Sequence, residues 1–164
     1  MDYYFGLAKT ENISDIFSLY QQRVQWMDAT GLKQWNVTDY LNAFPLSYYY
    51  ALQEAGKLYV LTEGKQVAGA LALFDHDDYW PDSDNASAYY IHHLVSDINH
   101  RGAGRYLLKQ AEKIAALHGK EYLRLDCAAD NITLFKYYEK MGYVYAGKCQ
   151  DGPYIGKRLT KKLY

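Results

Sequence analysis

A glycine turn set between two apolar segments is the feature that most constrains the fold of this chain. The turn occupies residues 100–105 and contains two glycines and two arginines. Residues 88–95 before it are rich in β-branched and aromatic side chains, which predicts a strand of a covered sheet. Residues 106–118 after it repeat apolar side chains at helical spacing, and Gly119 predicts the end of that helix. The chain must therefore connect a buried strand to an amphipathic helix through one tight turn.

This arrangement of strand, turn and helix is typical of an anion site. Gly102 and Gly104 allow the backbone to come close to a ligand and to adopt positive φ. The first N–H groups of a helix have no internal partner, and the helix dipole attracts negative charge to them. Arg101 and Arg105 add two full positive charges. Glycines also occur at such turns for steric reasons alone, so the isolated turn leaves a purely structural role open.

The segment that follows the helix narrows the class of protein. The sequence has neither the phosphate loop of nucleoside triphosphatases nor the dinucleotide-binding fingerprint. Residues 122–127 predict a second strand, and residues 130–143 then resemble the motif N-x-x-A-x-x-x-Y-E-K-x-G-F of the GNAT N-acetyltransferase superfamily. The residues that match in register are Asn131, Tyr138, Glu139, Lys140 and Gly142, with Leu134 for the alanine and Tyr143 for the phenylalanine.

The glycine turn resembles the R/Q-x-x-G-x-G/A loop of the same superfamily in two alternative registers. If Gly102 and Gly104 are the motif glycines, Asn99 takes the position of the Arg or Gln. If Arg101 is the motif arginine, Tyr106 takes the position of the last glycine. Both registers place the backbone amides of residues 100–105 at the phosphates of the cofactor.

The resemblance implies a GNAT-like α/β fold for a single domain that spans residues 1–164. Its central sheet is expected to be mixed and mostly antiparallel, with splayed parallel central strands, and to be flanked by about four helices. The residue pattern predicts further strands at 3–8, 58–62, 66–74, 143–147 and 154–159. It also predicts a helix from Thr10 or Asn12 to Gly31, a second helix over 46–55, and an acidic loop over 75–84.

The resemblance also implies a reaction and a set of cofactor-binding residues. The expected reaction transfers an acetyl group from acetyl-CoA to a primary amine of a small molecule, peptide or protein. The main chain near Leu94 and Val95 is expected to hold the thioester oxygen, and Asn131 to contact the pantetheine or thiol end. The pyrophosphate is expected to bind six successive residues of the turn: His100, Arg101, Gly102, Ala103, Gly104 and Arg105.

The reaction needs a group that releases a proton and a group that takes one. Tyr138 is the predicted general acid, because a phenol is acidic enough to reprotonate a departing thiolate. Residues 88–95 contain no carboxylate that would serve as the base. By strand alternation Tyr90 and His92 share one face, which the family register directs toward the acceptor. His92 is therefore the predicted base, with water as the alternative, and Tyr90 is a predicted contact of the substrate or of a water molecule.

Aromatic residues of the N-terminal half are candidates for the wall of the acceptor site. In the superfamily the first helices and their connection build much of this wall. Trp26, Trp35 and residues 48–50 are aromatic here, and Trp35 is the predicted substrate contact. Packing in the core is the competing interpretation, because aromatic residues at helical spacing more often pack than bind.

Composition and charge limit the classes of partner that the protein is expected to bind. The 164 residues carry a formal net charge of −1 and scattered basic residues, which argues against nucleic-acid binding. No apolar run predicts a membrane span, and the N-terminal residues do not resemble a signal peptide. Two cysteines, Cys127 and Cys149, fit a reducing cytoplasm. Buried free thiols are favoured for them, and a disulfide between them is the alternative. His76 and its acidic neighbours match no set of metal ligands, so no metal is expected.

Two alternatives stay open at the level of the sequence. A homodimer is compatible with the sequence, which does not specify an oligomeric state. The same fold also serves in a non-catalytic module that binds coenzyme A or an amine as a sensor. Tyr138 in register with the motif favours the enzyme over the sensor.

Overall fold

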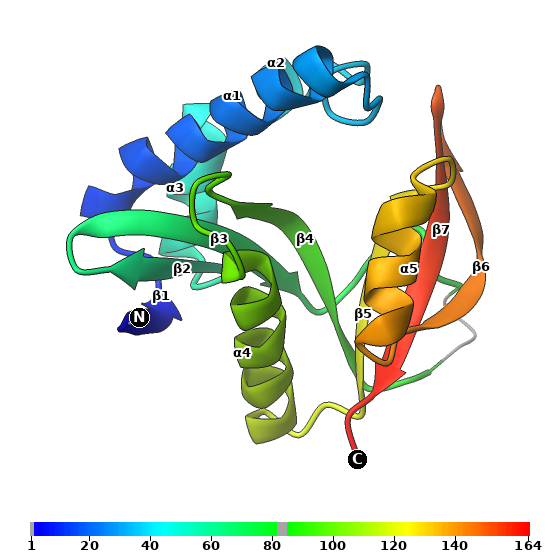
Figure 1. Cartoon of the computed structure of the whole chain (residues 1–164). Helices are drawn as coiled ribbons and strands as arrows, with labels where there is room; N and C mark the ends of the chain where they lie inside the picture. The colour runs from blue at the N-terminus through cyan, green and yellow to red at the C-terminus, as the bar shows by residue number, and fades with distance from the viewer. Residues whose placement is uncertain (1, 82–84) are drawn as a thin grey trace. The chain divides into compact units, whose positions relative to one another are not determined.

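The computed structural model describes residues 2–81 and 85–164 and is drawn in Figure 1. Its strands are β1 (Tyr3–Leu7), β2 (Leu58–Glu63), β3 (Gln66–Phe74), β4 (Ala88–Ser96), β5 (Tyr122–Ala128), β6 (Val144–Asp151) and β7 (Tyr154–Lys162). Its helices are a 3-10 turn (Thr10–Asn12), α1 (Ile13–Thr30), α2 (Tyr40–Ala43), α3 (Leu46–Glu54), α4 (Ala103–Leu117) and α5 (Ile132–Lys140).

The strands form one mixed sheet in the order β1-β2-β3-β4-β5-β7-β6. Strand β2 pairs antiparallel with β1 and β3, and β7 pairs antiparallel with β5 and β6. Strands β4 and β5 are parallel, and their paired residues are Ala88–Tyr90 with Tyr122–Arg124. The predicted fold, a mostly antiparallel sheet with a parallel pair at its centre, is confirmed.

The chain divides into two compact units, and β4 contributes residues to both. The first unit contains the chain up to Leu73 together with His92–Gln110, and the second contains Phe74–Ile91 with Ala111–Tyr164. The assignment of residues 1–164 to one domain stays a prediction.

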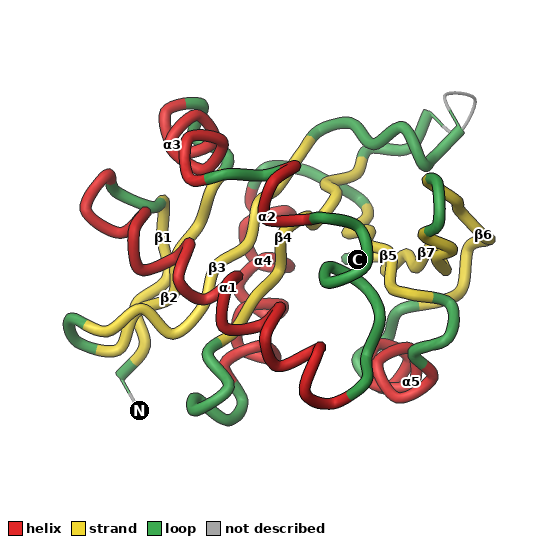
Figure 2. Tube along the Cα trace, turned by 90° about the horizontal axis from the view of Figure 1, so that it is seen from above, coloured by secondary structure: helices red, strands yellow, loops and turns green. Residues whose placement is uncertain are grey.

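In the first unit, α1 and the first turns of α4 lie on opposite sides of strands β2 and β3 (Figures 1 and 2). Ile13, Ile16 and Tyr20 of α1 are completely buried, as the helical spacing of its apolar residues predicts. A Cβ atom on Gly69 of β3 would lie 2.6 Å from a methyl carbon of Leu107. The absence of a side chain at Gly69 therefore lets α4 pack closely against the sheet.

In the second unit, α5 lies along one side of β5 and β7 (Figures 1 and 2). Asn131 is the N-cap of α5, and its side-chain oxygen accepts a 3.1 Å hydrogen bond from the main chain of Leu134. Gly142 follows the helix with φ of 96°, a conformation that a glycine adopts without strain. Two residues of the motif, Asn131 and Gly142, thus have structural roles at the two ends of α5.

The predicted element boundaries differ from the structure at two places that matter for the site. Helix α4 begins at Ala103, so that Gly104 lies in its first turn rather than before it. The one-turn helix α2, which the sequence did not predict, lies between α1 and α3. Of the predicted acidic loop, residues 82–84 lie outside the described residues. None of the helices in the described part of the chain has the length and apolar character that a membrane span requires.

Candidate functional site

The backbone of strand β4 is irregular after its short pairing with β5. The last paired residue is Tyr90, and three residues later His93 has φ of 57°, in the left-handed region. A residue with positive φ inside a strand interrupts the alternation of side chains between the two faces. The face of the sheet on which the side chains of Leu94 and Val95 lie therefore cannot be deduced by counting along the strand from Tyr90.

Three tyrosine hydroxyls hold His93 in this conformation. Tyr20 of α1 donates a 2.6 Å hydrogen bond to the main-chain carbonyl of His93. The hydroxyl of Tyr40 in α2 lies 2.5 Å from Nδ1, and that of Tyr48 in α3 lies 2.9 Å from Nε2. The carbonyl and both ring nitrogens of His93 thus have partners, and these come from three different helices.

The imidazole of His93 is neutral in this environment. Burial lowers its pKa to about 3, and the neighbouring His92 contributes in the same direction. A neutral ring has one N–H and one lone pair, so one of its tyrosine partners donates and the other accepts. The chain of hydrogen bonds continues over 2.8 Å from Tyr40 to Tyr49, which is completely buried. The chain of hydrogen bonds thus runs from the half-buried Tyr48 through His93 and Tyr40 to the core.

The predicted substrate contact Trp35 belongs to the same aromatic cluster. Its ring stacks on Tyr40 with centroids 4.4 Å apart and an angle of 15° between the planes, and it also packs on Tyr20. The ring of His92, the predicted base, lies 6.0 Å from the ring of His93. The roles of Trp35 and His92 toward a substrate stay predictions.

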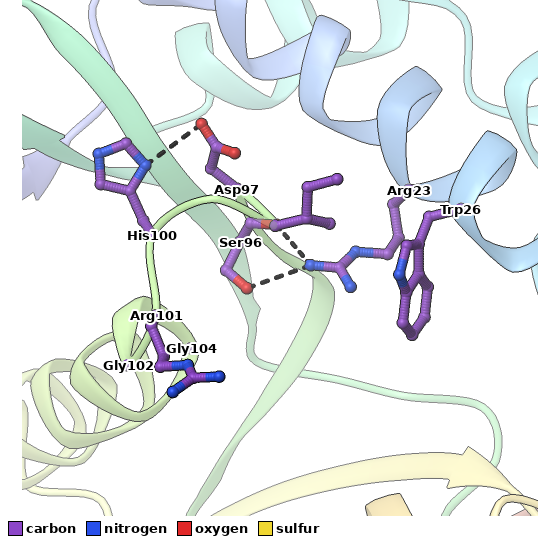
Figure 3. A pocket seen from close by; sticks show the side chains of 9 residues that line it. Arg23, Trp26, Ser96, Asp97, His100, Arg101, Gly102 and Gly104 are labelled. Atoms are coloured by element: carbon purple, nitrogen blue, oxygen red, sulfur yellow. Dashed lines mark hydrogen bonds and ion pairs between the residues drawn. The ribbon is translucent and has the colours of Figure 1, made fainter. Parts of the chain in front are cut away.

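A pocket of about 230 Å³ opens at the glycine turn, and all of its lining residues belong to the first unit. They come from α1, from the end of β4 and from the turn (Figure 3): Arg23, Trp26, Ser96, Asp97, Ile98, His100, Arg101, Gly102 and Gly104. Gly102 has φ of 86°, which a residue with a side chain adopts only under strain. The glycine turn predicted from the sequence therefore borders a cavity, and four of its six residues line that cavity.

Two residues of the turn that line this pocket have open backbone donors. No acceptor for the main-chain N–H of Gly102 or Gly104 is found among residues 2–81 and 85–164. These donors stand at the N-terminal end of α4, where the helix dipole is positive. Arg101 of the turn and Arg23 of α1 add two guanidinium groups to the lining. The pocket thus combines two backbone donors with two positive charges, which suits an anion with several oxygens.

A half-buried histidine and two carboxylates support the base of the turn. Nδ1 of His100 lies 3.2 Å from a carboxylate oxygen of Asp97, and its Nε2 lies 3.2 Å from Glu63 at the end of β2. The other carboxylate oxygen of Asp97 accepts a 2.9 Å hydrogen bond from the main chain of Asn99. These contacts tie the turn to β2 and to the end of β4.

In the second unit, Tyr90 packs in a small core cluster with Trp80. Only 8% of Tyr90 is exposed, and its hydroxyl accepts a 3.2 Å hydrogen bond from Arg124. The guanidinium of Arg124 lies 4.3 Å from the ring centroid of Trp80. These contacts account for Tyr90 as a packing residue, and its predicted contact with a substrate stays a prediction.

Tyr138 and Asn131, the two motif residues with predicted roles, also belong to the second unit. Tyr138 is 6% exposed and packs on Tyr143, with ring centroids 5.9 Å apart. Burial raises the pKa of its phenol well above the usual value of 10, and the neighbouring Cys127 adds to the effect. Tyr138 therefore carries its proton at neutral pH, and the raised pKa makes it a weaker proton donor than an ordinary phenol.

The two cysteines are free thiols. Cys127 of β5 and Cys149 of β6 are both buried and form no disulfide. Burial raises the pKa of Cys127 to about 11 and that of Cys149 to about 12. Both thiols are therefore protonated at neutral pH and are unsuited to act as nucleophiles there. Within the described residues, no group of three or more His, Cys, Asp or Glu side chains is arranged to hold a metal ion.

The sequence analysis missed Arg23 as a lining residue and placed Trp26 in the acceptor wall rather than at the glycine turn. One signal pointed to Arg23. It lies three residues after Tyr20 and four before Met27, both of which are buried on the inner face of α1. A charged residue at a core position of an amphipathic helix needs a specific partner or a ligand.

Comparison with known proteins shows the family. The model of the Acetyltransferase (GNAT) family matches residues 19–143. The chain is 24% identical over 160 residues to an uncharacterised N-acetyltransferase, YesJ, from Bacillus subtilis (strain 168), covering 93% of this chain and 88% of that protein. The family model spans most of the chain, including the glycine turn and the motif of α5. The chain therefore belongs to the GNAT acetyltransferase family.

Solved structures share the fold. A GNAT-family acetyltransferase from Listeria monocytogenes 4b F2365 superposes with a TM-score of 0.80 at 24% identity, covering 98% of this chain and 94% of that one. The PaiA N-acetyltransferase from Thermoplasma acidophilum, solved in complex with coenzyme A, superposes with a TM-score of 0.75 at 17% identity, covering 99% of each chain. At these identities the likeness concerns the fold.

Proposed function

We propose that this protein transfers an acetyl group from acetyl-CoA to the amine of a small molecule or peptide. The observation that carries the proposal is the pocket at the glycine turn, with its two arginines and its open backbone donors. Membership of the GNAT family and the coenzyme A complex of a structural neighbour support the choice of cofactor.

The residues of the pocket fit the diphosphate of coenzyme A. A diphosphate offers several acceptor oxygens, and Gly102 and Gly104 offer main-chain N–H groups for which the described residues hold no acceptor. Their missing side chains leave room for close approach, and Arg101 supplies charge at the same wall. His100, Ala103 and Arg105 complete the proposed binding turn, and Asn131 is proposed to contact the thiol end of the cofactor.

The acyl group requires hydrogen-bond donors for its carbonyl oxygen. We assign this role to the main chain at Leu94 and Val95, directly after the left-handed residue His93. The tyrosine contacts of His93 fix the backbone direction at this point, so that the donors are preorganised before a substrate arrives. Bound acetyl-CoA supplies the activated acetyl group.

The proton transfers are assigned to Tyr138 and His92. The attacking amine has to be neutral, and His92 is the proposed acceptor of its proton, directly or through water. Tyr138 is the proposed donor to the departing thiolate. Trp35 and Tyr90 are proposed acceptor contacts, and a cytoplasmic location fits a cofactor of central metabolism.

Release of free thiol from acetyl-CoA tests the proposal. The purified protein is incubated with acetyl-CoA and panels of polyamines, amino acids and peptides, and the thiol is followed with a chromogenic disulfide. We expect release that depends on both the protein and one class of amine, with an acetylated product visible by mass spectrometry. Binding of coenzyme A without thiol release from any amine would contradict the enzyme.

The alternative function is a non-catalytic module that binds coenzyme A. The burial of Tyr138, at 6% exposure, is the observation in its favour, because a general acid has to reach the sulfur. Binding of coenzyme A without release of thiol in the presence of any tested amine distinguishes this module from the enzyme.

A further inference from the structure

Helix α1 is tied to the end of β4 by side chains one turn apart. Tyr20 donates to the carbonyl of His93 over 2.6 Å, and Arg23 donates through Nη2 to the carbonyl of Ser96 over 2.6 Å. Between them, the side chain of Gln22 accepts a 3.3 Å hydrogen bond from the main chain of Ile98. His93 and Ser96 lie beyond the residues of β4 that pair with β5. Side chains of α1 therefore provide the hydrogen-bond donors for these two carbonyls, which β5 does not.

Arg23 is held in place by only part of its guanidinium. Nη2 also lies 3.4 Å from the hydroxyl of Ser96, and the guanidinium carbon lies 4.8 Å from the ring centroid of Trp26. For Nε and Nη1, no acceptor is present among the residues that the structure describes. Figure 3 shows Arg23 beside Trp26, on the opposite side of the pocket from the turn that carries Arg101.

The charge of Arg23 lacks a direct carboxylate partner in this part of the chain. Burial lowers the pKa of its guanidinium and the nearby Asp97 opposes this effect, but a guanidinium keeps its proton at neutral pH. The oxygens of Asp97 are engaged by Asn99 and lie beside His100. Arg23 thus presents a fixed, partly desolvated cation with unused donors to a cavity that already contains the open amides of the glycine turn.

We infer that Arg23 is a cofactor-binding residue that completes the phosphate site from α1, with its free donors on the diphosphate of coenzyme A. The inference rests on the proposed function and adds to it a group that belongs neither to the glycine turn nor to the motif of α5. Because Nη2 stays on Ser96, a phosphate oxygen accepts a hydrogen bond from Nε or from Nη1, and the bound diphosphate links α1 to the turn across the pocket.

Calorimetric titration of the full chain with coenzyme A tests this role. The variants are Arg23→Gln, Arg23→Lys and, as a control for the loss of one charge, Lys33→Gln at an exposed position just after α1. We expect Arg23→Gln to raise the Kd for coenzyme A about ten- to a hundred-fold, the scale of hydrogen bonds to a charged group. Arg23→Lys keeps the positive charge and loses the planar guanidinium, so its Kd should lie between those of the unaltered protein and Arg23→Gln. Lys33→Gln should bind coenzyme A as the unaltered protein does.

Truncated ligands show which part of coenzyme A is responsible for the loss of affinity in Arg23→Gln. Dephospho-coenzyme A lacks the 3′-phosphate, so the Arg23→Gln penalty should persist with it, whereas pantetheine lacks the diphosphate and should show no penalty. A penalty that disappears with dephospho-coenzyme A would place Arg23 at the 3′-phosphate and overturn the inference. An equal penalty with pantetheine would show a general structural defect and would overturn it as well.

Inorganic pyrophosphate separates this inference from the proposed function. If the unaltered protein fails to bind coenzyme A, the proposed function fails. Pyrophosphate binding that weakens in Arg23→Gln would still support the anion site, and equal binding by both proteins would overturn it. Melting curves of the ligand-free variants identify a folding defect. If Arg23→Gln has one, the affinity of the unaltered protein is compared with that of Arg23→Lys, which retains a donor for Ser96.

Discussion

The hydroxyl of Tyr20 donates a 2.6 Å hydrogen bond to the main-chain carbonyl of His93, a residue held at φ of 57° inside strand β4. Positive φ costs a non-glycine residue about 1–2 kcal/mol, so surrounding contacts have to stabilise it. Tyr20 is completely buried, which makes this hydrogen bond independent of solvent. The bond connects α1 to the point of β4 from which the main chain continues to Leu94 and Val95.

Replacing Tyr20 by Phe should therefore lower the free energy of unfolding by about 1–3 kcal/mol, the cost of leaving a buried acceptor unpaired. Urea denaturation of the ligand-free protein measures it. Tyr4→Phe is the matched control, because Tyr4 is 61% exposed and its hydroxyl reaches water. Equal midpoints for the two variants would show that the Tyr20 hydroxyl contributes nothing to the left-handed conformation.

The neutral His93 predicts a particular dependence of stability on pH. Its pKa is about 3 in the folded protein and about 6.5 in an unfolded chain. Above pH 6.5 neither state binds the proton. As the pH falls from 6.5 toward 3, the unfolded state binds it first, and stability declines by up to about 1.4 kcal/mol per pH unit. Urea midpoints measured between pH 7 and 4 should decline less steeply in His93→Asn, which accepts positive φ and does not titrate. Identical slopes would show that His93 is protonated in the folded state.

Replacing Tyr138 by Phe should preserve packing and remove the proton donor. We expect kcat to fall roughly ten- to a thousand-fold while the Kd for acetyl-CoA stays within about twofold. Because burial raises the pKa of Tyr138, kcat of the unaltered enzyme should show no alkaline loss from this group up to about pH 9. Tyr137→Phe, on the neighbouring position of α5, is the control. Unchanged turnover in Tyr138→Phe would assign the proton to water.

Replacing His92 by Gln tests the proposed base through a pH profile. If His92 takes the proton of the amine, the acidic limb of kcat/KM should titrate near neutrality and disappear in the variant. His93 is not the source of such a limb, because its pKa is about 3. A limb that persists in His92→Gln, with activity near that of the unaltered enzyme, would leave His92 as a packing residue.

The sequence was sufficient for the fold where local chemistry decides the structure. Period-two and helical patterns, together with Gly31 and Gly119, predicted elements and their ends, and both glycines have positive φ. The motif of α5 supplied the family. The one-turn helix α2 was missed because its four residues, Tyr40–Ala43, are too few to show a helical period.

The candidate site could be predicted only where its residues are neighbours in the sequence. The turn at residues 100–105 is a local feature that lies beside a pocket, and its binding of phosphate stays a prediction. Arg23 and the tyrosines around His93 come from distant segments, and their convergence depends on tertiary packing. The left-handed conformation of His93 could not be predicted either, because the strand pattern of residues 88–95 predicts a regular alternation of side chains between the two faces.

The affinity of acetyl-CoA for Gly104→Ala tests the central claim, that the cofactor binds at the glycine turn, most directly. A Cβ atom at position 104 would lie 3.6 Å from the hydroxyl of Ser96, an ordinary contact, and φ of Gly104 is not positive. The substitution should therefore leave the ligand-free protein as stable as before or more stable, because alanine is favoured over glycine in a helix. The added methyl group lies at the wall of the pocket, so calorimetry should show a Kd raised at least about tenfold, and Gly104→Val should weaken binding further. An unchanged Kd in both variants, with melting curves that confirm folding, would contradict the account.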